Sequence, residues 1–367
     1  MAASIHTDAC GVIPLDNILI SNRVMRAVSF SFRIESLPNP LANPQSQARV
    51  SIKNTNLGAP GPAFGTREST TLKSPRHIRP ISAPRPFALW HLASLDAPTV
   101  AVVWSLAFAW AAGVRLPPWL PFMLALAVFA VYVFDRLLDA RSALLDSRFH
   151  RLLERHRFHW RHRRILAPLA AAAACAVAWM ILALMPPLAR ERNSILAAAS
   201  LAYFARVHST HRQRPFLPPI LTKELLVGLL FTGGCVLPTM GALRAFHHAP
   251  LWPLLGPPVF FAALASLNCH AIDAWEPSGE SRANHAASSS IPAQGIVMSL
   301  AGLLLAVLLF SPQPRAAAIL AAGAISALLL AMLDHHRGQL SPVTLRAAAD
   351  LVLLTPALLV PLAWIPR

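Results

Sequence analysis

Long apolar stretches follow one another through most of this chain and are separated by short polar segments. Most have roughly the 20 residues that an α-helix needs to cross about 30 Å of hydrocarbon. Hydrophobic residues make up 55% of the chain and charged residues 13%, a balance that a water-soluble domain could not cover with polar surface. The sequence therefore predicts an all-α, polytopic membrane helical bundle with about nine transmembrane helices. The expected spans are 96–114, 118–139, 165–187, 194–207, 220–241, 250–270, 291–311, 315–334 and 346–365.

Arginines in the connecting segments predict the orientation of these spans, because cytoplasmic loops carry an excess of basic residues. If the N-terminus is cytoplasmic, the loops on that side hold most of the loop arginines, including those of segment 148–164. We therefore expect an integral protein of a bacterial inner (plasma) membrane, with its N-terminus in the cytoplasm and its C-terminus on the opposite side.

The formal net charge of +16 raises the question of nucleic-acid binding. The excess of basic residues is divided between the first 85 residues and the cytoplasmic loops, where anionic headgroups account for it. We therefore expect membrane lipids as partners and no nucleic acid.

The first 85 residues have no sustained apolar periodicity and are rich in Pro, Ser, Asn and Arg. This composition predicts a disordered basic tail at 1–85, followed by a membrane domain at 86–367. A targeting segment and residues upstream of the true start are the two alternative explanations of the tail.

Two pairs of carboxylates are expected at the same membrane surface. Asp135 and Asp139 end the second apolar stretch, and their i, i+4 spacing places both on one helix face. Asp273 and Glu276, which are i, i+3 neighbours, end the sixth. Paired acids at a helix end can hold a divalent cation. Alternatively, these acids only meet water or pair with neighbouring arginines such as Arg136.

These segments resemble the UbiA superfamily of intramembrane prenyltransferases, which have nine helices and Asp-rich motifs of the form N-D-x-x-D-x-x-x-D on helices two and six. The resemblance covers about 88–367. Asp135-Arg136-Leu137-Leu138-Asp139 matches the second half of the first motif, and Leu95-Asp96-Ala97-Pro98-Thr99 is similar to the entry segment of the family.

The chain also departs from the family pattern. Val131 and Tyr132 stand where the first motif has Asn-Asp, and Cys269 and Ile272 replace acids of the second. Asp273 falls one residue late. Two carboxylates per motif remain, and Mg²⁺ needs only one or two carboxylates together with phosphate oxygens.

The resemblance implies transfer of a prenyl group from an isoprenoid diphosphate to an unidentified acceptor, with Mg²⁺ as the cofactor. Cleavage of the carbon–oxygen bond would leave an allylic cation, which apolar helices protect from water. The expected metal-binding and catalytic residues are Asp135, Asp139, Asp273 and Glu276. The expected diphosphate-binding residues are Lys223, Arg212, Arg155, Tyr203 and Asn268. Tyr203 has an alternative role in an interfacial aromatic belt.

Segment 150–164 is rich in His and Arg. We expect it to form a basic helix that lies on anionic headgroups, with a metal site at His156, His159 and His162 as the alternative. Under the resemblance, Arg155 or His159 would also contact diphosphate. Asp350, one turn inside the last span, should face protein or a wet cavity.

A second function class is a non-catalytic or transporter-like membrane protein derived from the same fold. The carboxylates missing from both motifs favour a protein that has lost catalysis. A transporter should instead have polar or broken helices near the bilayer midplane.

Overall fold

The computed structural model describes residue 82 and the ranges 84–145, 154–208, 222–246, 255–275 and 290–359. All of these residues belong to one compact unit, Ser74–Arg367. Two predicted site residues, Arg212 and Glu276, lie outside the described residues, as does the predicted tail up to residue 81.

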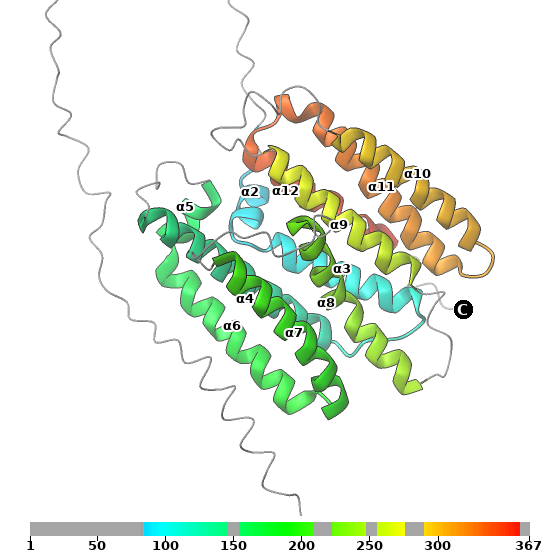
Figure 1. Ribbon diagram of the computed structural model, residues 1–367, viewed down its shortest axis with the longest axis horizontal. Coiled ribbons are helices and arrows are strands. Elements are labelled where there is room, and N and C mark those ends of the chain that lie inside the picture. The colour runs from blue at the N-terminus through cyan, green and yellow to red at the C-terminus, as the bar shows by residue number, and fades with distance from the viewer. Residues whose placement is uncertain are drawn as a thin grey trace, which may run out of the picture. The chain divides into compact units, whose positions relative to one another are not determined.

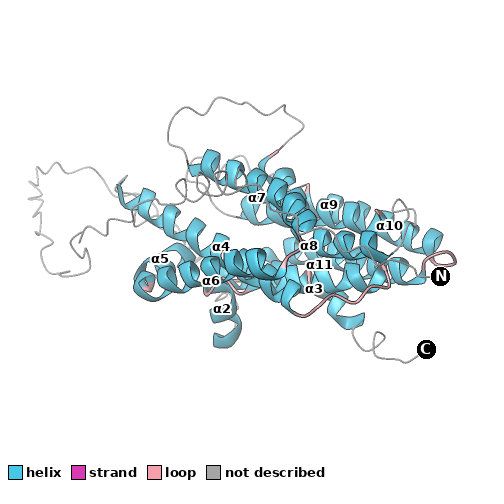
Figure 2. Ribbon diagram, turned by 90° about the horizontal axis from the view of Figure 1, so that it is seen from below, coloured by secondary structure: helices cyan, strands magenta, loops and turns pink. Residues whose placement is uncertain are grey.

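The regular structure of these ranges is helical, and no strand occurs among the described residues (Figure 1, Figure 2). Each of the nine predicted apolar stretches overlaps one helix, so the all-α class is confirmed. The helices are α2 (Arg85–Leu92), α3 (Asp96–Ala111), α4 (Trp119–Leu145), α5 (Glu154–Arg161), α6 (Arg163–Leu184), α7 (Pro187–His208), α8 (Lys223–Phe246), α9 (Gly256–Trp275), α10 (Ile291–Leu309), α11 (Pro314–His336) and α12 (Pro342–Val352), with 3-10 turns at Arg337–Gln339 and Thr355–Leu359.

Five of the described helices are long and apolar enough to cross a membrane: α4, α6, α8, α10 and α11. The number becomes six if α2 and α3, which meet at 83°, form one bent span. This finding supports a membrane protein, whereas the number nine remains a prediction. Helix α9 is not among the five, because prolines at its start and polar residues such as Asn268 and Asp273 near its end lower its hydropathy.

The helices pack as a series of neighbours. Helix α4 lies between α6 and α3, α3 also contacts α8, α8 contacts α9, and α11 lies between α9 and α10. The short helix α12 packs on α2, α3, α9 and α11, whereas α5 packs mainly on α4 (Figure 1). As a result, α2, α5 and α12 meet the end of the bundle where α3 begins.

Aromatic side chains fill the centre of this bundle. The rings of Trp104 on α3 and Phe261 on α9 stack with their centroids 3.9 Å apart, and Phe108 packs against both. The indole N–H of Trp104 donates to the carbonyl of Leu353 at 2.8 Å, so this buried polar group is satisfied. The core therefore fixes α3 against α9 and against the end of α12.

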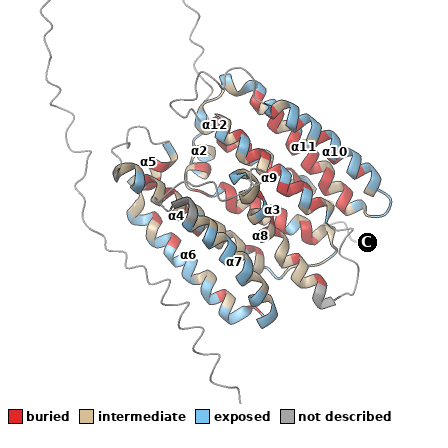
Figure 3. Ribbon diagram, in the orientation of Figure 1, coloured by how far each residue is buried: buried red, intermediate tan, exposed pale blue. Residues whose placement is uncertain are grey.

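Burial distinguishes the inner helices from the outer ones (Figure 3). In the most apolar 18 residues of each helix, the buried share is 61% for α11 but only 22–28% for α4, α6, α8 and α10. Large apolar side chains on α6 and α10, such as Trp179 and Val307, are more than half exposed. Such apolar outer surfaces suit contact with hydrocarbon.

Candidate functional site

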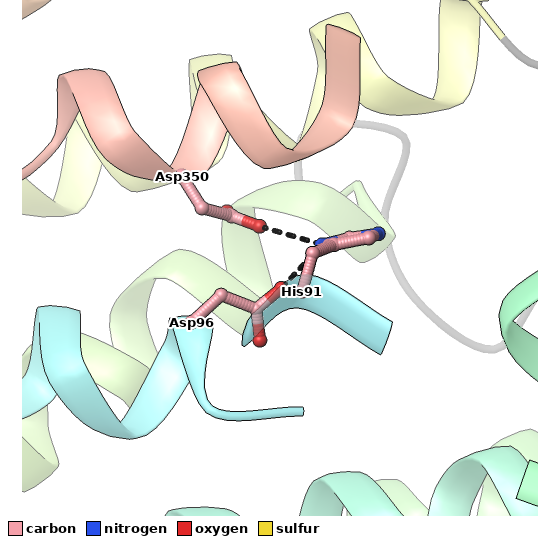
Figure 4. A group of neighbouring side chains, drawn as sticks. All are labelled: His91, Asp96 and Asp350. Atoms are coloured by element: carbon pink, nitrogen blue, oxygen red, sulfur yellow. Dashed lines mark hydrogen bonds and ion pairs between the residues drawn. The ribbon is translucent and has the colours of Figure 1, made fainter. Parts of the chain in front are cut away.

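Charged and polar side chains from distant parts of the chain gather at one end of the bundle. The best-defined group, here called the His91 cluster, consists of His91 at the end of α2, Asp96 at the start of α3 and Asp350 in α12 (Figure 4). One ligand atom from each side chain lies within 4.8 Å of the other two. Among the described residues, no other three His, Cys, Asp or Glu side chains form such a group.

The imidazole of His91 lies between the two carboxylates. Its Nδ1 is 2.6 Å from Oδ2 of Asp96 and 3.7 Å from Oδ2 of Asp350. The second oxygen of Asp96 accepts the backbone N–H of Ala97 at 2.9 Å. The His91 and Asp96 side chains are almost fully buried, whereas that of Asp350 is 17% exposed. Asp350 is therefore the most exposed member of the cluster.

The break between α2 and α3 positions this cluster. Ser94, in the break, has a φ of 60°, the left-handed conformation that L-residues other than Gly adopt at a cost. The turn brings His91 back over the first residue of α3. There, the Asp96 carboxylate also lies at a helix N-terminus, where the helix dipole favours negative charge.

Hydrogen bonds connect Arg136 on α4 to Ser94 in this break, and Ser94 to His159 on α5. One guanidinium nitrogen donates to Ser94 Oγ at 2.8 Å and to the carbonyl of His91 at 3.3 Å. Ser94 Oγ is 3.0 Å from His159 Nε2, and His159 Nδ1 is 2.8 Å from the carbonyl of Arg155. Because a carbonyl only accepts, Nδ1 carries the proton and Nε2 accepts from Ser94. Burial, together with the charge of Arg136, lowers the pKa of His159 to about 4.

Asn268 on α9 joins the His91 cluster. Its amide nitrogen donates to Oδ1 of Asp350 at 3.2 Å, and the residue is 5% exposed. Its amide oxygen is buried and has no hydrogen-bond partner among the described residues. The structure thus places this predicted diphosphate-binding residue beside a cluster of which the sequence indicated only Asp350.

A second group, here called the acidic rim, consists of Asp135, Asp139 and Asp273 with the cations of Arg155 and Lys223. Lys223 Nζ lies 3.7 Å from Oδ1 of Asp273, and both side chains are more than 60% exposed. Asp139 and Asp135 both interact electrostatically with Arg155. The rim thus pairs each predicted set of carboxylates with a predicted diphosphate-binding cation.

Burial shapes the basic side of the rim. It lowers the pKa of Arg155 to about 10, helped by the nearby charge of Arg136 and opposed by Asp139 and Asp135. Nε of Arg155 donates to Nε2 of His156 at 3.1 Å. Burial and this neighbouring cation lower the pKa of His156 to about 3. The imidazole that faces Asp139 at 3.7 Å is therefore neutral.

Tyr203 on α7 lies between the two sides of the rim. Its hydroxyl lies near Asp135 on α4, Cys269 on α9 and Glu224 on α8. No three rim carboxylates, however, come within 4.8 Å of one another in the described part of the chain. The described members of the predicted groups are thus at the same end of the bundle, but they do not form one compact metal site.

Sequence reasoning missed His91 and the roles of Ser94 and Arg136. One signal was present in the apolar segment around Asp350, because a carboxylate at that depth requires a partner. In addition, α5 confirms that segment 150–164 contains a helix. Its histidines form no metal group with one another in the described part of the chain.

The chain matches no protein-family model, no curated protein and no solved structure. The likeness to the UbiA superfamily therefore remains a prediction from its motifs.

Proposed function

We propose that this protein is a membrane-embedded enzyme of the UbiA type, which transfers a prenyl group from an isoprenoid diphosphate to an acceptor with the help of Mg²⁺. The main support is the acidic rim, where carboxylates and cations from α4, α5, α8 and α9 meet at one end of an apolar bundle. A prenyl diphosphate has the same two-part character. Its headgroup requires cations, and its chain requires an apolar surrounding.

The donor set of the rim suits Mg²⁺ in its chemistry. Carboxylate oxygens are the ligands that this hard cation prefers, and one or two of them suffice when phosphate oxygens complete the shell. Asp135 and Asp139, one turn apart on α4, would hold the ion on one side of the diphosphate, and Asp273, on α9, would hold metal on the other side. Bound Mg²⁺ would neutralise charge on the departing diphosphate. Glu276 is proposed to hold the metal together with Asp273.

The basic residues of the rim would bind the headgroup. Arg155 and Lys223 each interact with carboxylates, and an arriving diphosphate would replace some of these contacts with stronger charge-assisted hydrogen bonds. Arg212 is proposed to act with them. The Tyr203 hydroxyl would donate to a phosphate oxygen, while the apolar helices exclude water from the allylic carbon until the acceptor attacks.

Reconstituted protein and radiolabelled prenyl diphosphates test this proposal. We expect Mg²⁺-dependent release of diphosphate that Asp135→Asn lowers by about 10²- to 10³-fold, the usual effect of removing a group that stabilises transition-state charge. Glu191→Gln, which changes an exposed acid near the start of α7, should leave release unchanged. Absence of release with every chain length, or equal rates for wild type and Asp135→Asn, would overturn the proposal.

One observation favours transport as a second function. The 83° break between α2 and α3 carries the buried His91 and Asp96. Transporters also build substrate sites from broken helices with buried ionisable groups, but near the bilayer midplane, whereas this break lies at the end of the bundle where α3 begins. Proteoliposomes separate the two functions. A transporter would accumulate labelled prenyl diphosphate without cleaving it, whereas a protein that only binds would do neither.

A further inference from the structure

The His91 cluster has the composition of a metal site that is separate from the acidic rim. We propose that His91, Asp96 and Asp350 bind a divalent cation of the first transition row. Neighbouring ligand atoms around a cation with bonds of about 2.1 Å lie roughly 3.0 Å apart at right angles. The distances from His91 Nδ1 to the two carboxylates, 2.6 and 3.7 Å, lie on either side of that value. Shifts of several tenths of an ångström would complete the site.

The charge of the cluster also favours a cation. Two carboxylates in a largely buried position cost free energy unless positive charge compensates them. Arg136 supplies part of this charge while one of its nitrogens donates to Ser94 Oγ and to the carbonyl of His91, and His91 supplies more when it is protonated. A divalent cation would compensate both carboxylates and would leave the imidazole neutral, in the form that binds metals.

Asn268 provides an independent observation. Its buried amide oxygen has no hydrogen-bond partner among the described residues, although its nitrogen is held by Asp350. Leaving a buried acceptor unsatisfied costs about 1–3 kcal/mol. An amide oxygen is a common ligand of divalent cations, either directly or through a bound water. A cation beside Asp350 would give this oxygen a partner once the amide group turns its oxygen towards Asp350.

The mixture of donors indicates the kind of cation. An imidazole nitrogen favours transition metals over Mg²⁺, and carboxylate and amide oxygens suit Mn²⁺ among them. An ion would reach the cluster past Asp350, its most exposed member, whose side chain is 17% exposed. The ion would link α2, α3 and α12, elements far apart in the sequence, so its binding should also raise the stability of the fold by mass action.

Mn²⁺ alone, without any prenyl diphosphate, is the probe. Full-length protein in detergent is freed of metal with a chelator and titrated with Mn²⁺. We expect an equivalent of bound ion whose pulsed EPR spectrum shows coupling to an imidazole ¹⁴N, and an unfolding temperature that rises with Mn²⁺ concentration. Asp350→Asn should weaken binding by at least about 10-fold. His91→Gln should remove the ¹⁴N coupling.

Two variants outside the cluster serve as controls. Glu191→Gln changes an exposed acid of α7, and His156→Gln changes the imidazole that faces Asp139. Both should leave the affinity and the ¹⁴N coupling intact. Failure of wild type to bind Mn²⁺, unchanged binding by Asp350→Asn, or loss of the ¹⁴N coupling in His156→Gln would each overturn the proposal. Because no diphosphate is present, these outcomes are independent of prenyl transfer.

Discussion

The His91 cluster and the acidic rim lie at the same end of the bundle and combine the same side-chain chemistry in different surroundings. In the cluster, His91 and Asp96 are almost fully buried and 2.6 Å apart. In the rim, Lys223 and Asp273 are more than 60% exposed and 3.7 Å apart, and the Asp139 side chain is 42% exposed.

This difference assigns different tasks to the two regions. Solvent and salt screen exposed charges, so their pairing contributes little and the groups can exchange partners. Buried charges interact strongly, and removing one partner leaves the other uncompensated. A group that must bind and release a charged substrate therefore fits the rim, whereas a group that holds helices in place fits the cluster.

Removal of the Asp96 charge should have the largest effect and tests the contrast directly. Asp96→Asn removes the nearer of the two carboxylates beside His91 and should lower the free energy of unfolding by about 3–5 kcal/mol. The same change in the rim, Asp273→Asn, should stay within about 0.5 kcal/mol. Thermal unfolding in detergent measures both. Similar losses in the two variants would show that the cluster is no more tightly coupled than the rim.

Ser94 offers a sharper test of how the break between α2 and α3 supports the cluster. Ser94→Ala removes the hydroxyl between Arg136 and His159 and should cost about 1–3 kcal/mol, because buried groups lose a partner. Ser94→Gly removes the same hydroxyl but relieves the left-handed backbone, which costs a non-glycine residue roughly 1–2 kcal/mol. The Gly variant should therefore unfold at the higher temperature. The opposite order would mean that the backbone at Ser94 is not strained.

The helices could be predicted from the sequence because their cause is local. Most of the apolar stretches are long enough to cross hydrocarbon as helices that satisfy their own backbone, and each stretch overlaps a helix in the structure. Five helices meet the length and hydropathy of a span. The stretch 194–207 lies in α7, whose first turns carry Arg190, Glu191 and Arg192. Local hydropathy does not decide whether such a helix crosses the membrane.

The candidate site was predicted only in part, because its formation depends on packing. Spacing along α4 predicted that Asp135 and Asp139 share a face, which needs one helix alone. The His91 cluster needs the turn at Ser94 and the docking of α12, which bring Asp350 to a histidine far away in the sequence. No periodicity encodes that approach. Asp350 indicated a missing partner but not its identity.

Acid should loosen α5 through His159. This imidazole faces Arg136 of α4, Asp96 of α3 and Arg155 of its own helix, and its pKa is lowered to about 4 from an ordinary 6.5. Between pH 4 and pH 6.5, His159 therefore stays neutral while α5 is docked, but it binds a proton when α5 is detached. Through His159, docking should weaken by at most about tenfold per pH unit as the pH falls from 6.5 towards 4, and should not change above 6.5. His156, whose pKa is also lowered, adds a dependence of the same sign. Hydrogen exchange of α5 amides, corrected for intrinsic rates, measures it. An equal slope in His159→Gln would contradict the assignment.

The smallest effect is expected for the exposed pair of the rim, and it completes the comparison. A double-mutant cycle with Lys223→Met and Asp273→Asn should give a coupling of about 0.2–1 kcal/mol in unfolding experiments, and salt should reduce it. His91→Gln combined with Asp96→Asn, measured in the same way, should give a clearly larger coupling that salt leaves nearly unchanged, because these side chains are buried. Equal couplings would remove the reason for assigning substrate exchange to one region and a fixed ion to the other. A strong, salt-resistant coupling between Lys223 and Asp273 would mean that the rim is itself a closed structural pair, which a diphosphate could not easily open.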